Sequence, residues 1–178
     1  NRMKLVVTGG AGFVGLNLIK VLVSKRFQEK PLEEIVIVDS FEYSSLTEFW
    51  DTLRECDEIE VSNDGNTGFI HSGHQTVKIM IEKADVRDIS VATRVCARTD
   101  TVVHLAAQTG IPLSLERPRH DMTVNVQGTF NYLDACRLNK VGRFLNASSA
   151  AVLGSSTKPQ TEESRLEPVS PYGASKAS

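Results

Sequence analysis

Residues 5–22 constrain the fold more than any other part of the chain. They begin with the apolar run Leu5–Val7 and continue with the turn Thr8-Gly-Gly-Ala-Gly-Phe-Val-Gly15. An apolar segment, residues 16–22, follows the turn and is typical of a helix. A short buried strand that passes through a glycine-rich turn into a helix opens a βαβ unit, and units of this kind build parallel sheets.

Each glycine of the turn has its own expected role. Gly9 permits the tight turn, Gly12 lets the backbone approach a diphosphate, and Gly15 allows the helix to pack closely on the strand. The free N–H groups at the start of the helix then face the phosphates, where the helix dipole favours negative charge. The turn therefore predicts a dinucleotide-binding site.

Strands and helices alternate along the rest of the chain. We predict strands at residues 5–8, 35–38, 77–83, 101–105 and 143–147. We predict helices at residues 12–26, 45–56, 88–98 and 120–139, and a last helix capped by Ser170. Residues 62–75 are expected to form a loop or a hairpin tip inside a long crossover. This alternation predicts one α/β domain over residues 1–178, a doubly wound parallel sheet in the order 3-2-1-4-5.

Composition excludes several classes of partner. The chain has 178 residues, 40% of them hydrophobic, with a net charge of −2, so nothing in its composition suggests a polyanion-binding surface and we expect no nucleic-acid partner. No apolar run approaches the ~18 residues of a membrane span, and because the first predicted strand starts near Lys4 we expect no signal peptide. The three cysteines are widely spaced, so we expect buried thiols in a reducing, cytoplasmic setting.

Asp39 bears on which dinucleotide binds. It stands 24 positions after Gly15, at the end of the second predicted strand. A carboxylate there accepts hydrogen bonds from an adenosine ribose 2′-hydroxyl and repels a 2′-phosphate. Residues 31–53 contain no Lys or Arg, which favours NAD over NADP. The alternative is that Asp39 only caps the end of a strand.

Five further segments follow the glycine turn in order: Asp85-Val-Arg-Asp88, His104-Leu-Ala-Ala107, Asn125-Val-Gln-Gly-Thr129, residues 147–154 and Tyr172-Gly-Ala-Ser-Lys176. Together with the Gly-x-x-Gly-x-x-Gly spacing of the turn, they resemble the extended short-chain dehydrogenase/reductase family. The resemblance is to its NAD-dependent nucleotide-sugar epimerase/dehydratase branch, and it covers essentially the whole chain.

The resemblance implies a set of contacts with NAD. Asp85 would contact the adenine amino group, and residues 105–107 would pass beneath the cofactor. Asn125 would bridge the backbone and the cofactor side, although a helix bend or a purely structural role is an alternative. The predicted cofactor-binding residues are Gly9, Gly12, Phe13, Val14, Gly15, Asp39, Ser40, Asp85, Val86, Leu105, Ala106, Ala107, Asn125, Tyr172 and Lys176.

The candidate catalytic residues are Tyr172, Lys176 and Ser149. Tyr172 and Lys176 are four positions apart and so share one face of a helix. An ammonium near a phenol favours the phenolate, which would accept a proton from a sugar hydroxyl while hydride leaves for nicotinamide. The resemblance implies that Lys176 also bonds the nicotinamide ribose and that Ser149 holds the reacting oxygen. The alternatives are a solvated tyrosine with a surface lysine, and Ser148 in place of Ser149.

Other polar residues are weaker candidates. His71 and His74 have a loose metal-ligand spacing, but no cysteine or carboxylate pattern completes a site, so we expect no metal. His104 ends a buried strand and is predicted to be a structural, hydrogen-bonded histidine. Arg117 and Arg119 are expected in a solvated polar loop, with contact to a diphosphate sugar as the alternative.

Two departures from the family pattern shape the functional prediction. Dehydratases of this branch carry an Asp-Glu pair where this chain has Ala150 and Ala151, so elimination is disfavoured. The prediction is a nucleotide-sugar 4-epimerase acting on a UDP-hexose or UDP-hexuronate. The alternatives are a 4,6-dehydratase, a decarboxylase or another oxidoreductase of the family, and, from a different class, a non-catalytic NAD-binding module.

The second departure is length. Family members continue beyond the lysine with a substrate-binding region, and the chain stops at Ser178. We therefore expect the cofactor-binding part of a longer enzyme, inactive by itself and a homodimer when complete.

Overall fold

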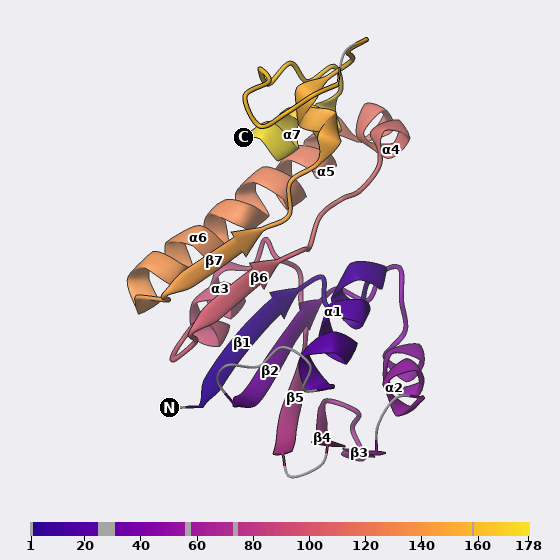
Figure 1. The fold of residues 1–178 in the computed structure, drawn as a ribbon, viewed down its shortest axis with the longest axis vertical. Coiled ribbons are helices and arrows are strands. Elements are labelled where there is room, and N and C mark those ends of the chain that lie inside the picture. The colour runs from indigo at the N-terminus through magenta and orange to yellow at the C-terminus, as the bar shows by residue number, and fades with distance from the viewer. Residues whose placement is uncertain (1, 25–30, 56–57, 73–74, 158) are drawn as a thin grey trace.

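A parallel sheet with helices on both faces forms the centre of the fold in the computed structural model, which describes residues 2–24, 31–55, 58–72, 75–157 and 159–178 (Figure 1). The described strands are β1 (Met3–Thr8), β2 (Leu32–Asp39), β3 (Glu58–Val61), β4 (Thr67–Ser72), β5 (Gln75–Lys83), β6 (Thr101–His104) and β7 (Arg143–Asn146). They form one sheet in the order β3-β4-β5-β2-β1-β6-β7. The pairs within β5-β2-β1-β6-β7 are all parallel, which confirms the predicted order 3-2-1-4-5.

The helices cover both faces of the sheet and its carboxyl edge. They are α1 (Phe13–Val23), α2 (Leu46–Arg54), α3 (Ile89–Val95), α4 (Ile111–Glu116), α5 (Pro118–Met122), η1 (Thr123–Gln127), α6 (Gly128–Asn139), η2 (Ala150–Leu153) and α7 (Pro171–Ala177). Helices α1 and α2 pack on one face, and α3 and α6 pack on the other. Helix α7 lies beyond the carboxyl ends of the strands (Figure 1).

Two segments differ from the prediction. In the first, residues 62–75, the expected loop or hairpin tip also contains the whole of strand β4, which pairs antiparallel with both β3 and β5. Trp50 explains the position of this hairpin, since its indole N–H donates to the carbonyl of Gly65 at 2.8 Å. A Cβ on Gly68 would lie 2.5 Å from the same indole ring, so glycine is required for the contact.

The second segment contains Arg117 and Arg119, where a polar loop was expected. It forms the two short helices α4 and α5, although both arginines are exposed as expected. Helix α5 continues through η1 into α6, and η1 is a π-helical turn. The predicted helix at residues 120–139 is therefore part of a longer helical segment that widens in the middle.

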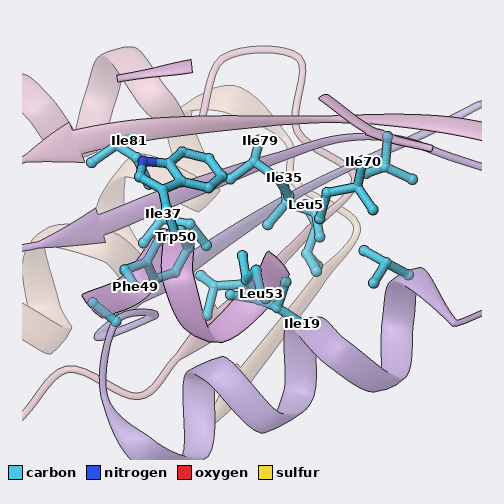
Figure 2. Packing of buried hydrophobic residues seen from close by; sticks show 14 of the residues in the cluster. Leu5, Ile19, Ile35, Ile37, Phe49, Trp50, Leu53, Ile70, Ile79 and Ile81 are labelled. Atoms are coloured by element: carbon cyan, nitrogen blue, oxygen red, sulfur yellow. The ribbon is translucent and has the colours of Figure 1, made fainter. Parts of the chain in front are cut away.

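The larger core lies between the sheet and helices α1 and α2 (Figure 2). Phe49, Trp50 and Leu53 of α2 are buried there against strand residues such as Ile37 and Ile79. The apolar spacing of α2 explains this, because positions 49, 50 and 53 fall on one helix face. A capping box fixes the start of α2: the hydroxyl of Ser45 accepts from the N–H of Glu48, whose carboxylate accepts from the N–H of Ser45.

The second core contains two of the cysteines. Cys96 and Cys136 are free and buried between α3 and α6, with their sulfur atoms 4.0 Å apart. This confirms for both the prediction of a buried thiol, while Cys56 lies outside the described residues. Over the described part of the chain, no helix has the length and apolarity that crossing a membrane requires.

His104 links the end of β1 to helix α6, as expected of a structural histidine. It is 1% exposed, with Nδ1 2.8 Å from the hydroxyl of Thr8 and Nε2 3.0 Å from that of Thr129. Thr129 donates its single hydroxyl proton to the carbonyl of Asn125 at 2.6 Å, so Nε2 of His104 carries the proton and donates to Thr129. The neutral imidazole therefore satisfies both of its nitrogens.

Protonation of His104 is expected to destabilise the fold. Burial, and secondarily the charge of Lys176, lowers the pKa of His104 to about 4, below the ~6.5 of an unfolded chain. The unfolded chain then binds the proton more tightly, so this contribution is complete above the unfolded value and is lost as the pH falls toward 4. We expect a loss of about 3 kcal/mol between pH 7 and pH 4 from this residue.

Urea unfolding of the wild-type chain and of His104→Gln at both pH values checks this expectation. The difference between the two proteins removes the contribution of the carboxylates, which titrate in both. Equal losses of unfolding free energy on acidification would contradict the assignment to His104.

Candidate functional site

A cavity of about 490 Å³ lies where the carboxyl ends of the central strands meet. It is lined by the glycine turn after β1 and by the segments that follow β2, β5 and β6. The predicted cofactor-binding residues that line it are Gly9, Gly12, Phe13, Val14, Gly15, Asp39, Ser40, Asp85, Val86, Leu105, Ala106 and Ala107. Asn125, Tyr172 and Lys176 do not line it. A site at the carboxyl edge of a parallel sheet is the usual ligand position in this fold class.

The glycine turn has the conformation that its residue types predict. Gly9 has a φ of +66°, and a Cβ there would lie 2.7 Å from the backbone nitrogen of Ala106. A Cβ on Gly15 would lie 2.6 Å from the Cα of Gly10. Gly12 is exposed and is the N-cap of α1, where no side chain accepts from the first turn of the helix. The N-terminal N–H groups of α1 are therefore offered to the cavity.

Asp39 ties the glycine turn to the end of β2. Its Oδ2 accepts from the N–H of Ala11 at 3.0 Å, and its Oδ1 accepts from the N–H of Phe41 at 2.9 Å. These bonds agree with the strand-end role that was the alternative reading of Asp39. Each carboxylate oxygen has further acceptor capacity, and the side chain lines the cavity, so a contact with a ribose hydroxyl stays a prediction.

The segment after β5 is held in place by an ion pair and by α6. Arg87 donates from Nε to Oδ1 of Asp85 at 2.9 Å, and hydrogen bonding from Arg87 lowers the pKa of Asp85. Asn131 of α6 donates to the backbone carbonyls of Val86 and Arg87 at 3.2 and 2.9 Å. Gly128 allows this approach, because a Cβ there would lie 2.6 Å from the side chain of Val86.

Several residues that line the cavity were not predicted. Glu42, Tyr43 and Ser44 extend the segment after Asp39, and Gln108 and Thr109 extend the segment after Ala107. In the sequence, only their position next to predicted cofactor-binding residues indicates that they line the cavity.

His120 and Val124 also line the cavity. They come from α5 and η1, and no local pattern in the sequence indicates them. Their position depends on how these helical turns pack over the sheet.

The candidate catalytic residues lie on two elements that pack together. Ser149 is the N-cap of η2 and accepts from the N–H of Ala151 at 3.2 Å. Helix α7 lies directly on η2, since a Cβ on Gly173 would be 2.5 Å from the carbonyl oxygen of Ala151. Tyr172 and Lys176 are both partly buried on α7, whereas Ser148 is exposed. Burial lowers the pKa of Lys176, which does not fit a freely solvated surface lysine.

Asn125 connects the cavity wall to α7. It is 4% exposed, and its side-chain oxygen accepts from the N–H of Gln108 at 2.8 Å. Its amide nitrogen lies 3.1 Å from the carbonyl of Gln108 and 2.9 Å from the hydroxyl of Ser175. The bridge that Asn125 forms is thus between the segment after β6 and the helix that carries Tyr172 and Lys176.

The comparison with protein families decides the classification. The sequence pattern described as the NAD dependent epimerase/dehydratase family matches residues 5–178. The chain belongs to this family. A dTDP-glucose 4,6-dehydratase of Actinoplanes sp. is 33% identical over 177 residues, which are 98% of this chain and 49% of that protein. A putative UDP-glucose 4-epimerase of Methanocaldococcus jannaschii is 29% identical over 175 residues, 97% of this chain and 47% of that protein.

Solved structures of the family agree with the fold. DesIV, a dTDP-glucose 4,6-dehydratase from Streptomyces venezuelae crystallised with NAD, has a TM-score of 0.78 and 30% identity. The comparison covers 98% of this chain and 48% of DesIV. The UDP-glucose 4-epimerase of Thermus thermophilus in complex with NAD has a TM-score of 0.72 and 28% identity, covering 98% and 48%. The chain thus spans about half the length of the relatives it matches.

Proposed function

We propose that the protein containing this chain is an NAD-dependent nucleotide-sugar 4-epimerase. The observation that carries the proposal is the pairing of two features at one sheet edge. The glycine turn opens the N-terminus of α1 into a cavity, and helix α7, with Tyr172 and Lys176, lies beyond the same strand ends on η2 (Figure 1). The first feature suits a diphosphate, and the second suits proton transfer.

The residues that line the cavity fit NAD. Backbone N–H groups after Gly12 would hold the diphosphate, and the carboxylate of Asp39 would accept from the adenosine ribose. Asp85 and Val86 would meet the adenine. When bound, NAD supplies an acceptor for hydride from the sugar and a donor that returns it to the other face of the keto sugar.

The side chains on α7 and η2 would handle the proton and the oxygen. Tyr172 would accept the proton of the C4 hydroxyl, and the ammonium of Lys176 would favour its phenolate form. Ser149 would donate a hydrogen bond to the reacting oxygen and hold it in place. Lys176 would also bond the nicotinamide ribose.

Ala150 and Ala151 favour epimerisation over dehydration. Elimination of water needs an acid and a base beside the sugar, and methyl groups supply neither. A 4,6-dehydratase is the second candidate, favoured by the 33% identity with the Actinoplanes dehydratase.

We also infer that the complete protein is a homodimer, that it lies in the cytoplasm, and that its substrate is a nucleotide sugar.

The product of the complete protein tests the proposal. The protein encoded by the whole reading frame is incubated with UDP-hexoses, a UDP-hexuronate and dTDP-glucose. Inversion at C4, read by NMR without net NADH absorbance, is the expected result. A 4-keto-6-deoxy sugar would identify a dehydratase, and steady NADH accumulation would identify a dehydrogenase or decarboxylase. Bound NAD without turnover of any sugar would favour a binding module.

Asp39→Asn is expected to weaken NAD binding about tenfold, because a ribose hydroxyl then bonds a neutral amide in place of a carboxylate. Discrimination against NADP is expected to fall as well, since the charge that repels a 2′-phosphate is removed. Calorimetric titration of the chain with both nucleotides measures the two affinities. Asp51→Asn, on the exposed side of α2, is the matched control. Unchanged affinities would leave Asp39 with its strand-end role alone.

A further inference from the structure

Asp121 of α5 is a buried carboxylate, and one of its two oxygens has no hydrogen-bond partner in the described part of the chain. The residue is 0% exposed, and its Oδ1 accepts from the amide nitrogen of Asn125 at 3.2 Å. The other oxygen, Oδ2, is buried. Buried carboxylates are rarely left in this condition, because an unpaired charge away from water is strongly unfavourable. A positive group close to Asp121 would account for it.

Lys176 is the cation that the packing brings to this carboxylate. Helix α5 packs against α7, and Lys176 is partly buried on α7. Burial lowers the pKa of Lys176, and the negative charge of Asp121 opposes that effect. The described structure shows no direct ion pair between the two side chains, so Asp121 attracts Lys176 without contact.

Hydrogen bonds connect the same carboxylate to the backbone of α7. The amide nitrogen of Asn125 that donates to Asp121 also donates to the hydroxyl of Ser175 at 2.9 Å. Ser175 in turn donates to the carbonyl of Tyr172 at 3.0 Å. Asp121 is thus connected to α7 by hydrogen bonds through the Asn125 amide and Ser175.

The other titratable groups on the elements around α7 do not replace Asp121. His104, at the end of β6, is buried and neutral near pH 7. Glu116 of α4 and Arg119 of α5 are exposed, and His120 lines the cofactor cavity. Elements η1 and η2 contain no titratable side chain. Asp121 is therefore the one fully buried carboxylate in this set.

We propose that Asp121 is a positioning residue that serves as the buried counter-ion of Lys176. It keeps the lysine charged and holds α7 against α5 and η1. Its consequence for turnover rests on the proposed function, because the charge of Lys176 is what favours the phenolate of Tyr172. The charge interaction itself does not depend on catalysis and can be tested on the 178-residue chain.

The test is the pH dependence of acetylation at Lys176, because acetic anhydride reacts only with the unprotonated amine. Mass spectrometry of the digested chain gives the midpoint for Lys176, with exposed Lys140 as the internal reference. In Asp121→Asn we expect the midpoint to fall by about one pH unit, which is about tenfold more unprotonated amine at a fixed pH below it. Asp121→Glu is expected to restore much of the wild-type midpoint.

The sign of the shift separates a counter-ion from a merely structural residue. If Asp121→Asn only loosened α7, Lys176 would become more solvated and its midpoint would rise toward that of a free lysine. An unchanged or raised midpoint therefore overturns the proposal. Asp134→Asn, which removes a carboxylate paired with Arg137 on the outer side of α6, is the control and is expected to leave the midpoint unchanged.

A double-mutant cycle keeps the proposal testable if Asp121→Asn does not fold well enough to label. Lys176→Met leaves the carboxylate without its cation, so the urea midpoint is expected to fall, and adding Asp121→Asn is expected to restore part of it. Strictly additive losses would overturn the proposal. If the labelling shift is observed while the complete protein turns over no nucleotide sugar, the charge interaction between Asp121 and Lys176 is supported and the proposed function fails.

Discussion

Gly15→Ala is expected to disrupt the glycine turn and abolish NAD binding in the same step. The added Cβ would lie 2.6 Å from the Cα of Gly10 and 2.7 Å from the carbonyl oxygens of Gly9 and Gly10. These are all backbone atoms of the turn itself, so no side chain can move aside. We expect a loss of about 3 kcal/mol, a fall in Tm of roughly 6–12 °C, and no measurable binding of NAD.

A substitution at Gly12 is expected to affect NAD binding more than stability, and a substitution at Gly142 serves as its control. Gly12→Ala brings a Cβ to 3.3 Å from the carbonyl of Gly9 only, so we expect a small change in Tm but weaker NAD binding. Gly142→Ala, where the nearest atom is the carbonyl oxygen of Asp100 at 3.5 Å, is the matched control for both measurements. Calorimetry and thermal melts of the three variants give the comparison. A Gly15→Ala chain with wild-type Tm would show that the turn is less rigid than its contacts imply.

The parallel part of the sheet was predictable because its signals are local. Continuous apolar runs such as Ile35–Val38 indicate strands buried on both faces, and right-handed crossovers leave few possible orders. The β3–β4 hairpin was not predictable in the same way. Strand β4 contains Gly68, His71 and Ser72, and it forms because Trp50 packs on it and β5 pairs with it. The contact with Trp50 comes from outside the segment, so propensity alone predicted a loop or a hairpin tip.

The candidate site likewise contains residues that the local sequence predicts and residues that only the packing of distant segments places there. The glycine turn and the segment after β5 are short stretches whose roles follow from residue type and spacing. The position of His120 in the cavity wall and the burial of Asp121 both depend on α5 continuing into the π-helical turn η1 and packing against α7. The sequence shows Asp121 as one more polar residue near Arg117 and Arg119, and its complete burial is visible only in the folded chain.

Tyr172→Phe is expected to lower the turnover of the complete protein about a thousandfold while NAD binding is retained. The variant removes only the phenolic hydroxyl, which is the group that would accept the sugar proton. Tyr172 is partly buried on α7, and the hydrogen bond that it accepts from Ser175 uses its backbone carbonyl, which the variant keeps. Steady-state kinetics with the nucleotide sugar, together with calorimetric titration of NAD, measures both properties.

Tyr132→Phe is the matched control, because it also removes a phenolic hydroxyl, here from a buried tyrosine of α6. That hydroxyl is buried without a hydrogen-bond partner in the described structure, and burial raises the pKa of Tyr132. Losing it removes an unpaired polar group, so we expect unchanged turnover and equal or slightly higher stability. A fall of less than about tenfold in Tyr172→Phe would exclude general-base catalysis by this phenol, since positioned proton transfer contributes about 10²–10⁴. The base would then have to be another residue near the reacting hydroxyl. Ser149 on η2 and Lys176 on α7 would be the next residues to substitute.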